Sequence, residues 1–221
     1  MPNNFVVFCE ARTGSYSLVS RLNSLDDIVC HGEVFKKERI EVSQFHKKQL
    51  IIDTIAKRNN NPIEFISSLR RINPKKHFGF KLLNHHLNWV PKIVDHLTND
   101  ETKKVLLYRD PIQVYSSTLR TQKTGVWTLK GSSAAAGQEA APRVEYTEET
   151  FSNFLNHYNR FIVFVRILAK MCNSFTMYYD QINDMDAISA VLNFIGSQES
   201  SSRSATAVSY THLTLPTILL V

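Results

Sequence analysis

An apolar run, a short polar turn and a helical pattern follow one another in residues 5–21, which read FVVFCEARTGSYSLVSR. The unbroken apolar run at residues 5–9 indicates a strand that is buried on both faces, as the strands of parallel sheets are. Beyond the turn at residues 10–15, apolar residues recur at helical spacing, at Leu18, Val19, Leu22 and Leu25. A strand, a tight turn and a helix in this order predict the first unit of a parallel α/β sheet.

The turn in this unit has the composition of an anion-binding loop. Free backbone N–H groups and the positive end of the helix dipole face such a turn, and Arg12 adds a guanidinium suited to phosphate or sulfate oxygens. An ordinary turn is the alternative, because one glycine beside Thr13 and Ser15 is a weak signal alone. The Walker A pattern GxxxxGK[ST] does not occur in the sequence, which argues against an ATPase loop.

Strand and helix patterns continue to alternate along the chain. Pro62 and Pro111 each stand where a helix is expected to begin, Asp110 is suited to cap the second of these helices, and Gly196 is expected to end the last one. The alternation predicts a three-layer α/β/α fold with a mainly parallel central sheet. Beyond the first unit, strands are predicted at residues 28–30, 77–83, 104–109 and 174–179, and helices at residues 42–58, 62–72, 87–97, 111–120, 147–171 and 184–195.

One α/β domain is expected to occupy residues 1–199, with a low-complexity loop, GSSAAAGQEAAP, at residues 131–142. Residues 200–221 differ in composition, being first rich in serine and then apolar. The string AVSYTHLTLPT at residues 207–217 resembles a translated sequencing adapter. We therefore expect a natural reading frame that is cut near residue 200, a C-terminally truncated domain, and a non-native or disordered tail.

A net charge of +6 and a pI near 9.2 favour an anionic ligand. No Lys and Arg run is interleaved with aromatic residues, so nucleic acid is not expected as a partner. Cys9, Cys30 and Cys172 form neither a disulfide framework nor a CxxC metal motif, and no metal is predicted. No apolar stretch is long enough to span a bilayer, and the first strand leaves no room for a signal peptide, so we expect a cytoplasmic protein.

Polar segments directly follow the predicted strands at residues 12–15, 31–33, 84–86 and 109–117. Ligands of open α/β sheets bind beyond the carboxyl ends of the strands, so these four segments are expected to meet at one edge. In the last segment Arg109 ends a strand and Ser117 follows eight residues later within a helix, a pair that could hold a second phosphate from two sides. Considered alone, this pair reads equally well as a solvated arginine and a helix-surface serine.

These segments together resemble the sulfotransferases that use 3′-phosphoadenosine 5′-phosphosulfate (PAPS). Residues 11–16, ARTGSY, resemble the PR[ST]G[ST]T loop that binds the 5′-phosphosulfate, and residues 109–117, RDPIQVYSS, resemble the R-[DN]-P-x(5)-S pattern that binds the 3′-phosphate. Three further segments look like the bacterial carbohydrate (trehalose-type) branch: HGEVF at residues 31–35, QKTGVW at 122–127 and YDQI at 179–182. Departures are Ala11 for the loop proline, Tyr16 for a loop hydroxyl, Asp180 for a glutamate, and the lack of an RKG-type C-terminal cofactor loop.

The resemblance implies a P-loop-like fold and a role for each matching residue. Glu33 is the first choice for the base that takes the proton of the acceptor hydroxyl, with His31, His85 or His86 as alternatives. Arg12 and Lys81 would neutralise charge on the leaving phosphate. The alternatives are that Lys81 only snorkels from its strand and that Glu33 is a solvated loop residue. The acceptor pocket would be lined by His31, Glu33, His86, Thr124 and Trp127, Trp127 being nearly as suited to the core. The residues expected to bind the donor are Arg12, Thr13, Gly14, Ser15, Tyr16, Ser17, Arg109 and Ser117.

Three functions are consistent with these observations. The first is a PAPS-dependent sulfotransferase that moves a sulfuryl group to a hydroxyl of a carbohydrate, glycolipid or small molecule, with a homodimer as one alternative for its assembly. The second is a nucleotide kinase or phosphotransferase, which the missing Walker lysine argues against. The third is a non-catalytic nucleotide-binding module that keeps the anion cradle without the chemistry.

Overall fold

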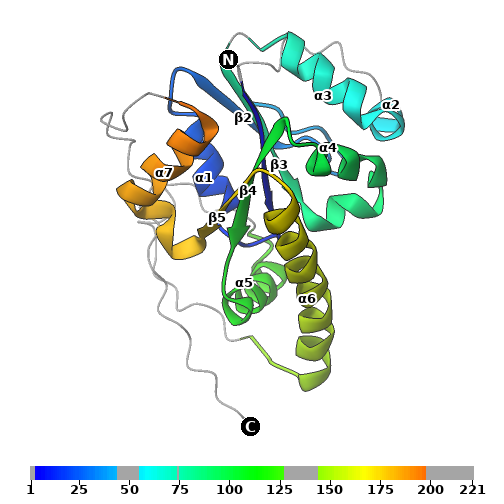
Figure 1. Cartoon of the computed structure of the whole chain (residues 1–221). Helices are drawn as coiled ribbons and strands as arrows, with labels where there is room; N and C mark the ends of the chain where they lie inside the picture. The colour runs from blue at the N-terminus through cyan, green and yellow to red at the C-terminus, as the bar shows by residue number, and fades with distance from the viewer. Residues whose placement is uncertain (1–2, 44–54, 74, 127–143, 198–221) are drawn as a thin grey trace.

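A parallel sheet of five strands, in the order β2-β3-β1-β4-β5, forms the centre of the molecule (Figure 1). The computed structural model describes residues 3–43, 55–73, 75–126 and 144–197. All four neighbouring strand pairs are parallel, which confirms the predicted sheet. The strands are β1 (Asn4–Cys9), β2 (Ile28–Glu33), β3 (His77–Leu83), β4 (Thr102–Tyr108) and β5 (Ser174–Tyr178).

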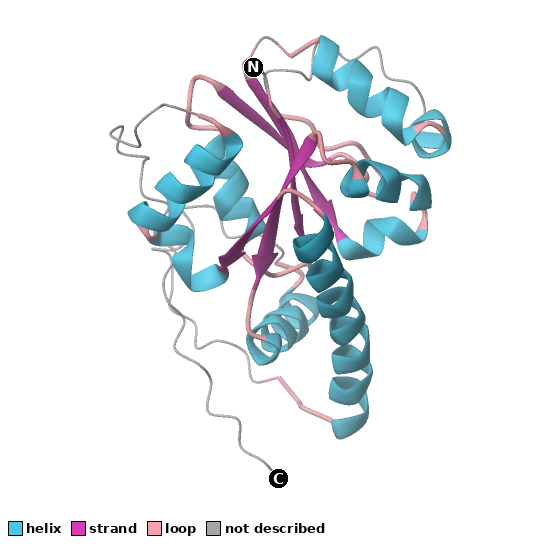
Figure 2. Cartoon of the chain, viewed as in Figure 1, coloured by secondary structure: helices cyan, strands magenta, loops and turns pink. Residues whose placement is uncertain are grey.

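Helices cover both faces of this sheet, as the three-layer prediction requires (Figure 2). Alternate residues of β1 point to opposite faces: Val6 and Phe8 join one apolar cluster, whereas Phe5 and Val7 join the other. The first cluster packs beneath α3, α4 and α6, and the second beneath α1 and α7. The helices are α1 (Ser15–Leu22), α2 (Ile55–Asn60), α3 (Pro62–Arg71), α4 (Val94–Thr98), α5 (Pro111–Thr124), α6 (Glu148–Met171) and α7 (Met185–Ile195).

The predicted helix ends follow from local backbone chemistry. Asp110 accepts a hydrogen bond from the N–H of Gln113 at 3.0 Å and so caps α5, as expected. Gly196 adopts a left-handed φ of 98° directly after α7, which confirms the predicted stop. Helix α5 runs four residues further than predicted and ends at Gly125, which is also left-handed.

The segment after β3 is not the single helix predicted at residues 87–97. It consists of two 3₁₀ turns, Asn84–Asn88 and Pro91–Ile93, followed by the short α4. Pro91 lacks an N–H group and disfavours a helical conformation at Val90, whose φ and ψ are −131° and 58°. The last strand also ends earlier than predicted, because Tyr179 begins a 3₁₀ helix, η3 (Tyr179–Asn183).

Other expectations fall partly or wholly outside the described residues. The predicted helix at residues 42–58 is seen only in its last residues, as the start of α2. The low-complexity loop at residues 131–142, the domain boundary at residue 199 and the tail at residues 200–221 lie outside the described ranges. In the ranges that are described, no helix combines the length and apolar character needed to cross a membrane.

Arg58 fixes the chain that follows β2. Its side chain is buried, and its Nη1 donates hydrogen bonds to the carbonyl oxygens of Val34, Lys36 and Arg39 at 3.0, 2.8 and 3.1 Å. A guanidinium suits this task because it carries several donors in a rigid plane. Helix α2 thereby holds in place the segment that begins at Glu33, the last residue of β2.

Candidate functional site

The site lies at the carboxyl edge of the sheet, where polar residues follow each strand. Contacts between side chains link the four segments that were expected to meet there. Arg12 contacts Ser117, Arg109 contacts the Arg12 backbone, and Asn84 contacts Glu10. Glu33 at the end of β2 contacts Lys81 in β3. The structure therefore brings segments from β1, β2, β3 and β4 to one edge.

The loop after β1 turns sharply through two residues with positive φ. Arg12 has φ 66° and Gly14 has φ 80°, and only the second is a conformation that its residue type adopts freely. Thr13 is buried, and its hydroxyl donates to the carbonyl oxygen of Glu10 at 2.8 Å. The Gly14 carbonyl accepts from the Ser17 N–H at 2.9 Å as α1 begins. Strained backbone of this kind concentrates at ligand-binding loops.

Three arginines gather beside this loop. Arg12 Nε donates to Ser117 Oγ at 3.0 Å, and Arg109 Nη1 donates to the Arg12 carbonyl at 2.7 Å. Burial, followed by the neighbouring charge of Arg109 and then Arg120, lowers the pKa of Arg12. Within the described ranges, no carboxylate lies within ion-pair distance of Arg109 or Arg120. Arg109 and Arg120 thus bring positive charge to the loop that these described carboxylates do not offset, which favours an anion there.

Arg120 was not among the residues predicted from the sequence. Its Nη1 is buried and has no hydrogen-bond partner in the described part of the chain. Its position three residues after Ser117, on the same face of α5, is the signal that could have identified it. Tyr179 closes the cluster from the side of β5, since its ring lies 3.8 Å from the Arg109 guanidinium carbon.

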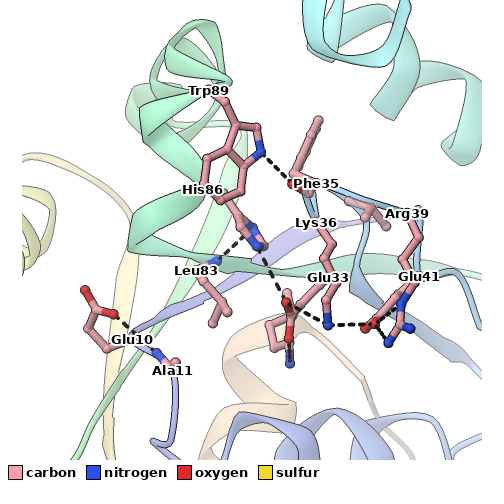
Figure 3. A network of polar contacts seen from close by, with 12 residues as sticks. Glu10, Ala11, Glu33, Phe35, Lys36, Arg39, Glu41, Leu83, His86 and Trp89 are labelled. Carbon is pink, nitrogen blue, oxygen red and sulfur yellow. Dashed lines mark hydrogen bonds and ion pairs between the residues drawn. The ribbon is translucent and has the colours of Figure 1, made fainter. Parts of the chain in front are cut away.

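Glu33 lies in a second polar cluster, drawn in Figure 3. Its Oε1 lies 2.8 Å from Lys81 Nζ, and its Oε2 lies 3.9 Å from Lys36 Nζ. The ring of His86 faces the same carboxylate, with Nε2 3.6 Å from Oε2, a contact too long for a hydrogen bond. The Leu83 N–H donates to Nδ1 of His86 at 3.3 Å, so the neutral ring carries its proton on Nε2, toward Glu33.

The neighbours of Glu33 hold it in its charged form. Burial raises its pKa, but the contact with His86 and the positive charge of Lys81 outweigh burial, so the pKa lies well below its usual value. A general base works best with a pKa near the operating pH. Glu33 is therefore well suited to accept a hydrogen bond at neutral pH and poorly suited to retain a proton.

The other residues predicted on the acceptor side differ in burial and in their distance from Glu33. His85 lies beside His86, with ring centroids 4.8 Å apart, whereas His31 is fully buried with its ring against Phe78. Thr124 is exposed at the end of α5, and its hydroxyl donates to the Arg120 carbonyl at 2.9 Å. Trp127 lies outside the described residues. The structure thus brings His85 and His86 to Glu33 but holds His31 in the interior.

The predicted donor-binding residues fall into a buried group and an exposed one. Thr13, Ser15 and Ser117 are buried at the loop, whereas Tyr16 is 54% exposed. Ser17 is partly buried in the first turn of α1. The side chain of Tyr16 is therefore directed outward, and the buried hydroxyls line the loop itself.

A third polar cluster surrounds Glu10, which the sequence analysis did not single out. Its side chain is buried at the end of β1, and its Oε1 accepts from Asn84 Nδ2 at 2.7 Å and lies 3.0 Å from His157 Nε2. The Ala11 N–H donates to its Oε2 at 3.3 Å. A carboxylate at a strand end, directly before an anion loop, is the sequence signal for this cluster. In the described ranges, no group of three or more His, Cys, Asp or Glu residues could hold a metal ion.

Two partly buried histidines predict how the free energy of unfolding depends on pH. Burial, then the charge of His86, lowers the pKa of His85 to about 4, and burial, then Lys104, lowers that of His96 to about 4. Unfolded histidines titrate near pH 6.5, so between about pH 6.5 and pH 4 the unfolded chain binds more protons than the folded one. We expect the free energy of unfolding to fall as the pH falls through this window. Urea unfolding at about pH 7.5, 6.5 and 5 measures it, and an unchanged slope in His85→Gln would contradict the prediction.

No protein-family model and no curated protein sequence matches the chain. Solved structures do resemble it. The mouse sulfotransferase SULT7A1 complexed with PAP superposes with a TM-score of 0.50 at 11% identity, over 90% of this chain and 61% of that one. A sulfotransferase from Alicyclobacillus acidocaldarius gives a TM-score of 0.51 at 14% identity, over 91% and 83% of the two chains. The chain thus spans about three fifths of the mouse protein's length, and it has the P-loop-like α/β fold of these structures.

Proposed function

We propose that this chain is a PAPS-dependent sulfotransferase that transfers a sulfuryl group to a hydroxyl. One observation carries the proposal: the hydrogen bond between Arg12 and Ser117 joins two motifs that lie 105 residues apart in sequence. The resemblance assigns one motif to the 5′-phosphosulfate and the other to the 3′-phosphate. Their meeting in a cluster of cations supports a ligand with two separate anionic groups.

The donor is held, in this proposal, by the loop after β1 and the start of α5. The N–H groups of residues 13–16, with the hydroxyls of Ser15 and Ser17, would surround the 5′-phosphosulfate at the positive end of α1. Arg109 and Ser117 would take the 3′-phosphate, and Arg12 lies between the two groups. Gly14 and Tyr16 would bind the phosphosulfate through their backbone N–H groups.

The acceptor would approach from the side of β2 and β3. Glu33, ionised and paired with Lys81, would accept a hydrogen bond from the acceptor hydroxyl and orient it toward the sulfur. Lys81 would offset charge that develops on the leaving phosphate, and His85 and His86 would border the acceptor. The trehalose-type motifs favour a carbohydrate or glycolipid hydroxyl, with a small-molecule hydroxyl as the wider class, and they would place Thr124 and Trp127 on this side.

A cytoplasmic location is part of the same proposal. Cys9 and Cys30 are buried free thiols, and Cys172 is a partly exposed one. Free thiols are typical of proteins that stay in a reducing compartment.

The proposal predicts stabilisation by PAP, adenosine 3′,5′-bisphosphate, which is what remains of PAPS after transfer. At a PAP concentration about 100 times Kd, binding adds about 2.7 kcal/mol to stability, which raises Tm by roughly 5–10 °C for a domain of this size. Thermal unfolding of the full chain with PAP, with AMP and with ATP plus Mg²⁺ measures the effect. PAP is expected to stabilise most, and AMP less because it lacks the 3′-phosphate.

The same measurement separates the competing functions. Stabilisation by ATP with Mg²⁺ but not by PAP would indicate a phosphotransferase and contradict the proposal. Stabilisation by PAP without any release of PAP from PAPS would indicate a non-catalytic nucleotide-binding module.

A further inference from the structure

We propose that His157, held in place by Glu10, receives the proton of the acceptor hydroxyl during sulfuryl transfer. This inference rests on the proposed function and adds a residue pair that no motif of the sequence contains. Glu10 acts in it as a positioning residue, and His157 acts as the proton acceptor.

Glu10 forms the fixed half of the pair. It is only 6% exposed, and its carboxylate accepts hydrogen bonds from the Asn84 side chain and the Ala11 backbone. Both of these donors are neutral. Among the described residues, no lysine or arginine lies within ion-pair distance of the Glu10 carboxylate, whereas Lys81 pairs with Glu33. Its charge remains available to the imidazole that it contacts.

His157 forms the accessible half of the pair. It comes from the first half of α6, the part that extends past the ends of β4 and β5 beside α5 in Figure 1. Its Nε2 lies 3.0 Å from Glu10 Oε1, while 51% of its side chain is exposed. An ionised carboxylate can only accept hydrogen bonds, so the neutral ring must carry its proton on Nε2. Nδ1 therefore keeps a free lone pair.

A buried carboxylate that holds one nitrogen of a partly exposed imidazole is an arrangement suited to general base catalysis. The carboxylate fixes the tautomer and stabilises the imidazolium that forms when the other nitrogen takes a proton. Glu33 offers no equivalent, because Lys81 already compensates its charge at 2.8 Å. Of the two carboxylate clusters, the one at Glu10 is thus better able to keep a proton.

The pair also lies at the right place along the sheet edge. Glu10 comes two residues before Arg12, so His157 stands beside the loop proposed to hold the phosphosulfate. Figure 3 shows Glu10 and Glu33 on either side of Leu83, in keeping with the strand order β2-β3-β1. Asn84 contacts Glu10 and the ring of His86 faces Glu33, so the segment after β3 borders both clusters. We place the acceptor that Glu33 orients between these two clusters.

The transfer step balances with this assignment. The acceptor oxygen forms a bond to the sulfur while the bond from the sulfur to the 5′-phosphate oxygen breaks, and that oxygen keeps the electron pair. The hydroxyl proton passes to Nδ1 of His157, which becomes an imidazolium paired with the Glu10 carboxylate. The products are the sulfate ester, PAP and a proton that the imidazolium later releases to water.

The test is the pH dependence of PAP release from PAPS by the full chain, with 2-naphthol and trehalose together as acceptors. Besides Glu10, the charged or titratable groups near His157 among the described residues are His85, in the 3₁₀ turn Asn84–Asn88, and Tyr158 and Arg160 on α6. An imidazole base predicts a rate that rises between about pH 5 and 8, where imidazoles ordinarily titrate. His157→Gln is expected to lose roughly 100- to 10,000-fold in rate together with this rise, and to keep PAP binding.

Two further variants separate positioning from structure. Glu10→Gln keeps the shape but not the charge, so the rise in rate should move to lower pH because a neutral amide stabilises the imidazolium less. Asn156→Gln, an exposed neighbour on α6, should behave like the wild type.

The inference is overturned if His157→Gln keeps the wild-type rate and pH profile, or if it loses PAP binding. Either result leaves the proposed function standing. If the wild-type rate of PAP release does not change with pH over this range and Glu33→Gln abolishes it, Glu33 receives the proton instead. A chain that binds no PAP, or binds it without turnover, would overturn the proposed function itself.

Discussion

The variant Gly14→Ala is expected to lose most of its PAP affinity and roughly 2–5 kcal/mol of unfolding free energy. The left-handed φ of 80° at Gly14 costs a residue with a Cβ about 1–2 kcal/mol. The added Cβ would lie 2.6 and 2.7 Å from two ring atoms of Tyr179 and 2.8 Å from Cδ1 of Ile182, and such overpacking typically costs about 1–3 kcal/mol. Because the Tyr179 ring also stacks on Arg109, a shift of this ring would disturb the proposed 3′-phosphate site.

Gly125→Ala is the matched control for this variant. Gly125 is also left-handed, with φ 69°, but none of the described residues comes within 4 Å of the position that a Cβ would take. It should therefore lose only the conformational part, about 1–2 kcal/mol, and keep PAP binding. Urea unfolding and calorimetric titration with PAP measure the two quantities. Equal losses in both variants would show that Tyr179 does not close the loop as the structure implies.

Arg109→Ala is expected to weaken PAP binding by roughly 10- to 150-fold, the equivalent of a hydrogen bond to a charged group. The effect should be larger for PAP than for AMP, which lacks the 3′-phosphate. A smaller loss for AMP is expected as well, because Arg109 also donates to the Arg12 carbonyl and so supports the loop. Arg71→Ala, at the exposed end of α3, is the control and should bind both nucleotides normally.

Equal losses for PAP and AMP in Arg109→Ala would refute the role assigned to this arginine. That result would mean that Arg109 acts through the loop alone, and the 3′-phosphate would have to contact other groups. Arg120, with its unpartnered Nη1, would then be the first residue to test.

The sheet could be predicted from the sequence because its strands are buried on both faces. β1 and β3 consist almost wholly of buried residues: β1 appears as a continuous apolar run, and β3 as a mainly apolar segment interrupted by Gly79 and Lys81. Helix caps such as Asp110 and Gly196 depend on neighbouring residues alone and were equally accessible. The broken helix after β3 is also signalled locally, by Pro91, which the prediction of one helix at residues 87–97 did not take into account.

The candidate site was predictable only as far as its motifs extend. Arg12, Arg109 and Ser117 belong to recognisable segments, whereas the contact between Glu10 and His157 spans 147 residues. It depends on how α6 packs beside β1, which no local pattern encodes. The ion pair between Glu33 and Lys81 likewise follows from the pairing of β2 with β3. It stabilises the charged form of Glu33, which makes this carboxylate a poorer proton acceptor. The sequence motifs therefore indicate more of the residues at the proposed donor side than of those around Glu10 and His157.

The two strands that end at the candidate site, β1 and β2, differ in how many neighbouring strands they pair with. β1, which leads into the donor loop, is the central strand and pairs on both sides, whereas β2, which ends at Glu33, is an edge strand with one partner. Edge elements exchange their amide hydrogens through local openings that leave central strands protected. In the proposed function, we therefore expect the end of β2 at Glu33 to open more readily than the loop after β1, so that the choice of acceptor could vary without loss of donor binding.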